Sequence, residues 1–218
     1  MTISSSLRTR TFPTTRSKRP KGSSKKRKTS TTTRSSPARR RFALGLGSNL
    51  GDSRRILEGA LARLEEALGP LVVAPLYLTE PVSPIPQPPY LNTVAIGESD
   101  LAAPDLLAVA QRIELEFGRE RGFSRPQPPR PDGPRTLDLD LLLLGDEVRA
   151  GAAPLLPHPR MRARRFVLSP LCDVAPDWRI PPDGATAREL LQQLPESPWA
   201  RRLPDPLRPA AAEAPVQR

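Results

Sequence analysis

Apolar residues recur with two different periods along the middle of the chain, and these periods predict both strands and helices. Short runs rich in apolar and β-branched residues predict buried strands, whereas apolar residues at helical spacing predict amphipathic helices. The predicted strands cover residues 42–47, 71–78, 90–96 and 137–144, and the predicted helices cover residues 56–68 and 105–117. The order strand, helix, strand, strand, helix, strand is the split βαβ order of a ferredoxin-like fold.

This order predicts an α+β protein, a ferredoxin-like α/β sandwich with a mainly antiparallel sheet and flanking helices. With the helices on one face, the other face or the edges of the sheet remain free for a site. Two proline-rich segments, residues 79–89 and 118–134, predict long loops. From residue 154 the pattern is irregular, with short helical pieces at residues 166–174 and 187–194.

Charge divides the chain into unlike parts. Residues 1–41 contain 14 Lys or Arg and no Asp or Glu, so the remaining residues hold 34 − 14 = 20 basic and 23 acidic side chains, a net charge of −3. A segment so poor in apolar residues predicts a disordered basic tail at residues 1–41, followed by a domain at residues 42–203 and a flexible C-terminus at residues 204–218. The tail is compatible with a transit peptide, a polyanion contact or a dispensable extension.

Composition excludes several classes of protein. A single Cys and a single His cannot form an internal disulfide or a structural zinc site. The longest uncharged apolar run, residues 141–145, is far shorter than the roughly 20 residues that span a bilayer. Because no signal-peptide core follows the basic start, we expect a cytoplasmic location and no membrane partner.

Asp138 and Asp140 are the strongest chemical signal. Side chains two apart on a strand share one face, which places these carboxylates about 6 to 7 Å apart. The two carboxylates repel each other unless a cation lies between them. Carboxylate oxygens are suitable ligands for Mg²⁺ that is bound together with substrate phosphates. The alternative is a half-exposed strand with Leu facing inward and Asp facing outward, although Asp is a poor strand residue.

Several basic side chains surround this pair in the sequence. Arg119 and Arg121 lie on the preceding loop, and Arg135 lies beside the strand. Guanidinium groups bind phosphate oxygens in bidentate geometry, so these residues fit a triphosphate. His158, held between two prolines, and the arginines of residues 162–166 are further candidates for contacts with an anion.

Tyr90 and Asn92 share a face of the third strand. An aromatic ring and an amide can stack on a flat heterocycle and hydrogen-bond to it, although both are equally compatible with ordinary packing.

Together these residues resemble a known family. Gly47-Ser48-Asn49-Leu50-Gly51-Asp52, Tyr90-Leu91-Asn92, Gly118-Arg119-Glu120-Arg121, Arg135-Thr136-Leu137-Asp138-Leu139-Asp140 and Pro157-His158-Pro159-Arg160-Met161 are similar, in order, to motifs of 6-hydroxymethyl-7,8-dihydropterin pyrophosphokinase. The resemblance implies a ferredoxin-like enzyme of folate biosynthesis that transfers the diphosphate of ATP to 6-hydroxymethyl-7,8-dihydropterin and releases AMP. It also implies two Mg²⁺ ions. We expect a monomer.

The resemblance assigns roles residue by residue. The implied metal ligands are Asp138 and Asp140, which are also catalytic together with Arg119 and Arg135. The implied ATP-binding residues are Gln111, Glu114, Arg119, Arg121, Arg135, Leu141, His158 and Arg164. The implied substrate-binding residues are Thr79, Val82, Tyr90, Asn92 and Phe166. Which group accepts the proton of the hydroxymethyl group remains open.

A binding module of the same fold is the alternative. A ferredoxin-like sheet with a basic tail could bind RNA. Such a module would need exposed aromatic residues on the sheet and a basic domain surface. The chain has only nine aromatic residues and its domain is slightly acidic, so nucleic acid is not expected as a partner except through the tail.

Overall fold

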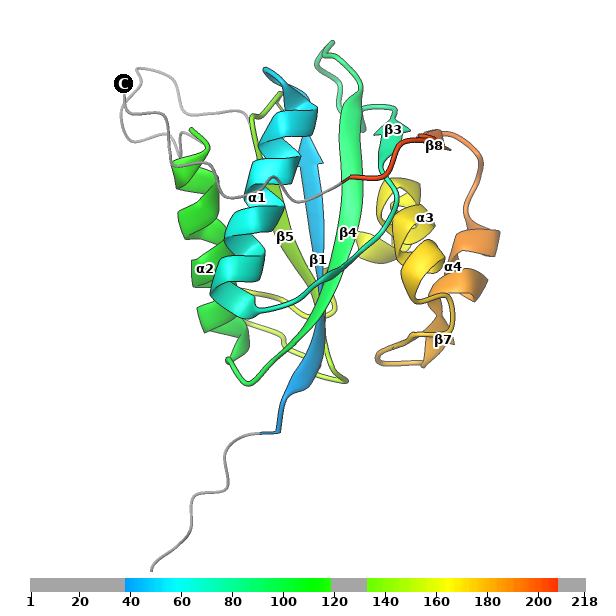
Figure 1. The fold of residues 1–218 in the computed structure, drawn as a ribbon. Helices are drawn as coiled ribbons and strands as arrows, with labels where there is room; N and C mark the ends of the chain where they lie inside the picture. Colours follow the sequence, from blue (N-terminus) through cyan, green and yellow to red (C-terminus); the bar gives the residue numbers. More distant parts are fainter. Residues whose placement is uncertain (1–37, 119–132, 208–218) are drawn as a thin grey trace, which may run out of the picture. The chain divides into compact units, whose positions relative to one another are not determined.

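The computed structural model describes residues 38–118 and 133–207, and at their centre lies an antiparallel sheet (Figure 1). Its strands follow the order β5-β1-β4-β3-β8, and β2 also pairs with β4. The strands are β1 (Arg40–Ser48), β2 (Val72–Val73), β3 (Tyr77–Thr79), β4 (Tyr90–Ser99), β5 (Asp138–Leu144) and β8 (Ala200–Arg202). The sequence predicted the order from β1 to β5, and the mainly antiparallel α+β architecture is confirmed.

Helices cover both faces of this sheet (Figure 1). One face carries α1 (Ser53–Leu68) and α2 (Ala103–Glu116). The other carries α3 (Arg165–Val174), which packs against β4, and α4 (Ala187–Gln193), which packs against α3. A 3₁₀ turn, η1 (Met161–Ala163), and a hairpin of β6 (Arg179–Ile180) and β7 (Ala185–Thr186) complete this second layer. The expectation of a free second face was therefore wrong in part, because short helices from the irregular C-terminal third cover much of it.

Local sequence signals explain where the helices begin and end. The carboxylate of Asp52 accepts a hydrogen bond from the Arg55 backbone N–H at 3.2 Å and caps α1, and Gly69, with φ of 90°, ends it. Proline lies in the first turn of α2, where no N–H is required. Thr186 and Glu189 form a capping box that starts α4.

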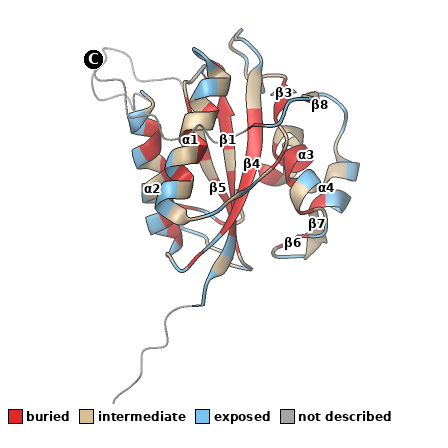
Figure 2. Ribbon diagram, in the orientation of Figure 1, coloured by how far each residue is buried: buried red, intermediate tan, exposed pale blue. Residues whose placement is uncertain are grey.

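Two hydrophobic cores lie on opposite faces of the sheet, and Figure 2 shows buried residues along the central strands between them. Leu44 and Leu46 of β1 pack with the buried face of α1, whereas Ala43 belongs to the core beneath α3. The central strands are therefore buried on both sides, which anchors them rigidly at the places where they support a site.

The predicted second strand, residues 71–78, is divided. β2 and β3 both pair with β4, and Pro75 lies between them. Because proline has no N–H to donate to the ladder, the strand is interrupted there.

A bulge distinguishes the two ends of β5. Ala43 pairs with Leu143 and Leu44 pairs with Leu141, so the register skips Leu142. Before the bulge, Leu139 faces the core beneath α1 and α2; after it, Leu144 faces the same core. The bulge thus keeps the apolar end of β5 buried on both faces while the other end presents its polar residues to one face.

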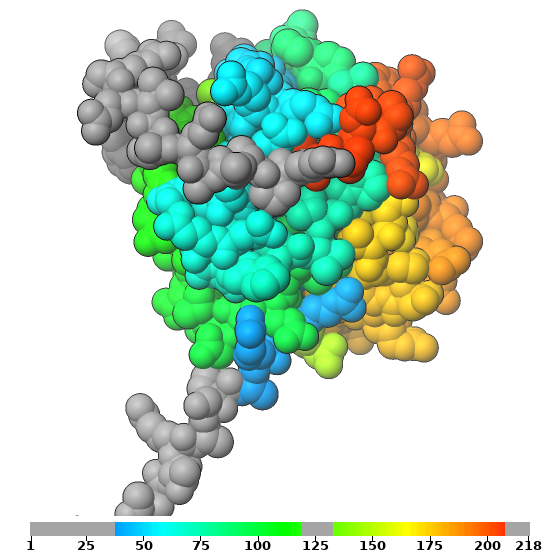
Figure 3. Space-filling model, viewed as in Figure 1, coloured from blue at the N-terminus to red at the C-terminus, as the bar shows by residue number. Residues whose placement is uncertain are grey.

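The described fold extends beyond the predicted boundaries at both ends. β1 begins at Arg40, inside the predicted tail of residues 1–41, and the Arg39 guanidinium donates to the Glu98 carbonyl at 2.7 Å. Residues 204–207 continue from β8 toward α1, where Arg54 donates to the carbonyls of Asp205 and Pro206, and Leu207 is buried. Figure 3 shows the red end of the described chain, which follows β8, at the surface beside α1. Residues 1–37 and 208–218 lie outside the described structure.

No described helix has the length and apolar character needed to cross a membrane.

The buried position of Leu207 generates a stability prediction. Leu207→Ala should lower the free energy of unfolding by about 2 to 3 kcal/mol, because it leaves a cavity in a core that the described C-terminus helps to close. Leu115→Ala, at a side chain that is 57% exposed, is the matched control and should change it by less than about 0.5 kcal/mol. Equal effects in chemical denaturation would show that residues 204–207 do not belong to the fold.

Candidate active site

Asp138 and Asp140 project from β5 to the same side of the sheet, as their spacing predicted, while Leu139 between them is buried. Arginines from other segments pair with each carboxylate: Arg135 Nη1 lies 2.9 Å from Asp138 Oδ2, and Arg164 Nη1 lies 3.6 Å from Asp140 Oδ2. The two side chains are 24% and 36% exposed, so both carboxylates remain accessible from the solvent.

Glycines in β1 leave the sheet open beside these carboxylates. Gly45 pairs with Asp140 and Gly47 pairs with Asp138, and on its other side Gly47 pairs with Asn92. A Cβ at Gly47 would lie only 2.6 Å from Asn92 Oδ1. Because Gly45 and Gly47 have no side chains, the backbone of β1 forms the floor of a pocket of about 340 Å³ between β5 and β4.

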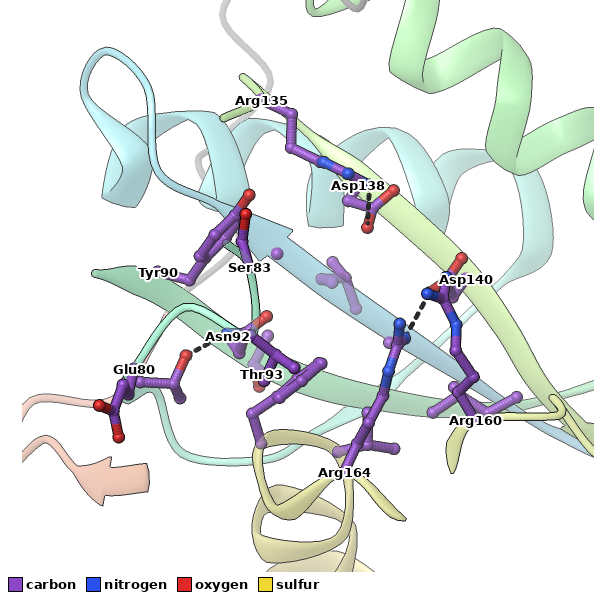
Figure 4. A pocket seen from close by; sticks show the side chains of 18 of the residues that line it. Glu80, Ser83, Tyr90, Asn92, Thr93, Arg135, Asp138, Asp140, Arg160 and Arg164 are labelled. Carbon is purple, nitrogen blue, oxygen red and sulfur yellow. Dashed lines mark hydrogen bonds and ion pairs between the residues drawn. The ribbon is translucent and has the colours of Figure 1, made fainter. Parts of the chain in front are cut away.

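The wall of this pocket opposite the carboxylates is aromatic and amide in character (Figure 4). Asn92 donates from Nδ2 to Thr79 Oγ1 at 2.6 Å, and the Tyr90 hydroxyl lies 3.0 Å from Gln87 Oε1 and 3.1 Å from the Gly133 carbonyl oxygen. All five predicted substrate-binding residues line the pocket: Thr79, Val82, Tyr90, Asn92 and Phe166.

A second cavity of about 340 Å³ lies beyond Asp140. Leu107, Leu141 and Leu155 give it apolar walls, and His158 lies at its polar side. Asp140 and Arg160 line both cavities, so the two spaces meet at these side chains.

The predicted nucleotide residues divide into four groups. Leu141 and His158 line the second cavity, and Arg135 and Arg164 line the first. Gln111 and Glu114 line neither; Glu114 is fully buried, and its Oε1 accepts a hydrogen bond from the Leu139 backbone N–H at 2.8 Å. Glu114 therefore supports the strand that carries the carboxylates. Arg119 and Arg121 lie outside the described residues.

The sequence did not single out Arg160. Its spacing in the sequence could have indicated it, because Arg160 lies four residues before Arg164, across the turn η1. Both arginines line the first pocket. Two other arginines of this segment point elsewhere. Arg162 pairs with Asp183, and Arg165 donates to the carbonyls of Leu194 and Pro195.

Burial and neighbouring charges tune the basic groups of the site. Burial lowers the pKa of His158 below its ordinary value near 6.5; the Asp140 carboxylate opposes this shift, and the cations Arg164 and Arg160 add to it. The pKa of Arg164 is also lowered, chiefly by burial and then by Arg160. For Arg135, burial acts to lower the pKa, but Asp138 and other partners outweigh it and the net shift is upward. The site thus combines a neutral imidazole with charged guanidinium groups.

Comparison with known proteins identifies the family that builds such a site. A sequence model described as 7,8-dihydro-6-hydroxymethylpterin-pyrophosphokinase (HPPK) matches residues 43–176. The chain is 43% identical over 157 residues to 2-amino-4-hydroxy-6-hydroxymethyldihydropteridine pyrophosphokinase of Pseudomonas aeruginosa, covering 71% of this chain and 92% of that protein. It is 39% identical over 153 residues to the enzyme of the same name from Synechocystis sp., covering 69% and 74%.

The chain belongs to the HPPK family. Its function is therefore pyrophosphoryl transfer in folate biosynthesis, as the motifs implied, and the enzyme is a transferase. None of these relatives is named as an RNA-binding protein, so they give the alternative of an RNA-binding module no support.

Solved structures agree on the fold of this HPPK chain. Wild-type HPPK-DHPS of Plasmodium falciparum matches with a TM-score of 0.56 at 15% sequence identity, covering 71% of this chain and 44% of that one. The chain thus spans less than half the length of these larger proteins, and the likeness concerns the fold alone.

The pocket floor generates a prediction about substrate binding by this HPPK. Gly47→Ala should raise the dissociation constant for the pterin at least about tenfold, because the new Cβ displaces Asn92; tenfold corresponds to about 1.4 kcal/mol, within the usual cost of overpacking. Gly45→Ala is the matched change, because its Cβ would lie 3.5 Å from the Leu142 side chain, an ordinary contact. Fluorescence titration of the pterin should show the larger loss for Gly47→Ala, and equal losses would contradict this description of the floor.

The only histidine of the chain permits a direct test of the electrostatics. In NMR spectra, His158 should titrate below the value near 6.5 that it shows in denaturant, because burial disfavours the imidazolium. Asp140→Asn should lower this pKa further, since the carboxylate now acts to raise it. A pKa above 6.5 in the folded protein, or a rise in the Asn variant, would refute the arrangement.

Proposed function

We propose that the diphosphate of ATP passes to 6-hydroxymethyl-7,8-dihydropterin where the two cavities meet at Asp140 and Arg160, beside Asp138 of the first cavity. This shared boundary carries the proposal, because the acceptor and the donor must both reach the atoms that exchange a bond. The pterin occupies the pocket of Tyr90 and Asn92, and the nucleoside of ATP occupies the cavity of Leu141 and His158.

The acceptor side of the site suits a flat heterocycle. Asn92 and Thr79 are buried and hydrogen-bonded to each other, so the amide is held in one orientation toward the pocket. Phe166 and Tyr90 supply aromatic surface. The pterin is thereby oriented with its hydroxymethyl group toward the carboxylates.

Asp138 and Asp140 have the donor set that Mg²⁺ requires. Their carboxylates are accessible, share one face, and lie where phosphate oxygens and water could complete a shell of hard oxygen ligands. We propose two ions, as the resemblance implies; the chemistry they supply is neutralisation of charge on the phosphates.

Arginines take up the remaining phosphate charge. Arg135 and Arg164 flank the carboxylates and Arg160 lies at the boundary of the cavities, so their guanidinium groups can bind phosphate oxygens from several sides. Arg119 and Arg121 are proposed to add to this set. Because the charges are preorganised, they stabilise the transferring group without large rearrangement.

The reaction needs no protein nucleophile. A bond forms between the hydroxymethyl oxygen and the β-phosphorus, and the bond from the β-phosphorus to the oxygen bridging the α-phosphorus breaks. AMP leaves with that oxygen, and the hydroxyl loses its proton. Asp138 and Asp140 are both candidate acceptors for this proton.

The setting of this activity is also a proposal. We propose a monomer, and the single Cys supports a reducing compartment such as the cytoplasm. We place the activity in the domain and assign no part in it to the basic tail.

Asp140→Asn tests the central assignment. It should lower kcat/KM for AMP formation at least about 100-fold, since a ligand of the phosphate-bound metal contributes several kcal/mol to the transition state. Asp146→Asn removes an exposed carboxylate just after β5 and should change the rate by less than about twofold. AMP release, measured by chromatography, at the wild-type rate in the Asp140 variant would refute the proposal.

A further inference from the structure

Asn49 belongs to the motif of residues 47–52, to which the proposed reaction assigns no task. It follows β1 directly, is only 7% exposed, and lines neither cavity. An amide so deeply buried must satisfy its donors and its acceptor within the protein. Its partners therefore show what it does.

One side of Asn49 holds the residue that precedes the carboxylates. The Asn49 backbone N–H donates to the Arg135 carbonyl at 3.1 Å, and the Arg135 backbone N–H donates to Asn49 Oδ1 at 2.8 Å. This pair of bonds fixes the backbone of Arg135 at the point where its guanidinium donates to Asp138 at 2.9 Å. The phosphate side of the site is thus anchored on Asn49.

The other side of Asn49 holds the loop of the pterin pocket. Its Nδ2 donates to Gln87 Oε1 at 3.0 Å and to the Pro88 carbonyl at 3.1 Å. Gln87 Oε1 also lies 3.0 Å from the Tyr90 hydroxyl. The amide orientation is unambiguous, because the Arg135 N–H needs an acceptor and the Pro88 carbonyl needs a donor.

The composition of that loop explains why an external donor is required. Residues 79–89 contain five prolines, none of which has a backbone N–H. Such a segment can be fixed mainly through its carbonyls and side chains, and the Asn49 amide reaches one of each. Loss of this amide would remove both hydrogen bonds from Asn49 to the loop, while the prolines would still restrict the loop backbone.

We propose that Asn49 is a positioning residue that couples the pterin loop to Arg135, so that both sides of the transfer site keep one mutual geometry. It contacts neither substrate and acts through Gln87 and Arg135. This inference rests on the proposed function and adds to it a specific connection between the two binding regions.

The experiment compares Asn49→Ala with Asn49→Asp in steady-state kinetics of AMP formation. The Ala variant loses both sets of side-chain bonds, so it should raise the KM for the pterin and lower kcat, each about tenfold, in line with the usual cost of unpaired buried groups. The Asp variant keeps the acceptor for the Arg135 N–H but loses the donors. It should raise the pterin KM while kcat falls less than about threefold.

Two controls separate positioning from general stability. Ser53→Ala removes a hydrogen bond to Ser48 from the same turn without contact to either loop, and both constants should stay near wild type. Gln87→Ala alters only the loop side, so it should raise the pterin KM and preserve kcat even if the Asn49 variants fail to fold. A fall in kcat with unchanged KM in the Asn49 variants, or an unchanged pterin KM in Gln87→Ala, would overturn the proposal.

The outcomes also separate the two levels of inference. If the wild-type chain forms no AMP from ATP and the pterin, the proposed function fails. If it is active and Asn49→Ala matches it in both constants, only the role of Asn49 fails.

Discussion

The mutual repulsion of Asp138 and Asp140 is the constraint around which the site is built. Two carboxylates on adjacent same-face positions of a strand are unfavourable unless cations neutralise them. Here arginines from two separate segments lie against them, and glycines of β1 keep the neighbouring surface clear. These arginines offset part of the repulsion, and the proposed Mg²⁺ ions and phosphates would complete the charge balance at a transfer site without a protein nucleophile.

The position of β5 follows from contacts behind this face. Glu114, buried on α2, accepts the Leu139 N–H from the side of β5 away from β1. Further along, the His158 N–H donates to the Leu142 carbonyl at 2.9 Å, at the residue skipped by the bulge. A buried acid and a proline-bounded loop thus satisfy backbone groups that an edge strand would otherwise expose. These contacts link the carboxylates to α2 and to the second cavity.

Periodicity predicted those parts of the protein that depend on neighbours in sequence. The alternation of Asp138 and Asp140 with Leu139, and of Tyr90 with Asn92, placed each pair on one face, and the family motifs supplied the pterin residues. Contacts between residues distant in sequence could not be predicted in this way. The packing of Leu207 in the core depends on the path of the chain after β8, and the position of Arg160 between the two cavities depends on the tertiary fold. The resemblance assigned Glu114 to the nucleotide, and the sequence of a helix gives no sign that one of its carboxylates will accept a hydrogen bond from a strand N–H, as Glu114 does from Leu139.

The fate of the β-phosphorus tests the account most directly. ATP labelled with ³²P at the β-position, incubated with the protein, Mg²⁺ and 6-hydroxymethyl-7,8-dihydropterin, should yield labelled pterin diphosphate and unlabelled AMP, because the bond broken lies between the α- and β-phosphates. Labelled ADP with an unlabelled pterin monophosphate would contradict the account, since the site would then transfer only the terminal phosphate.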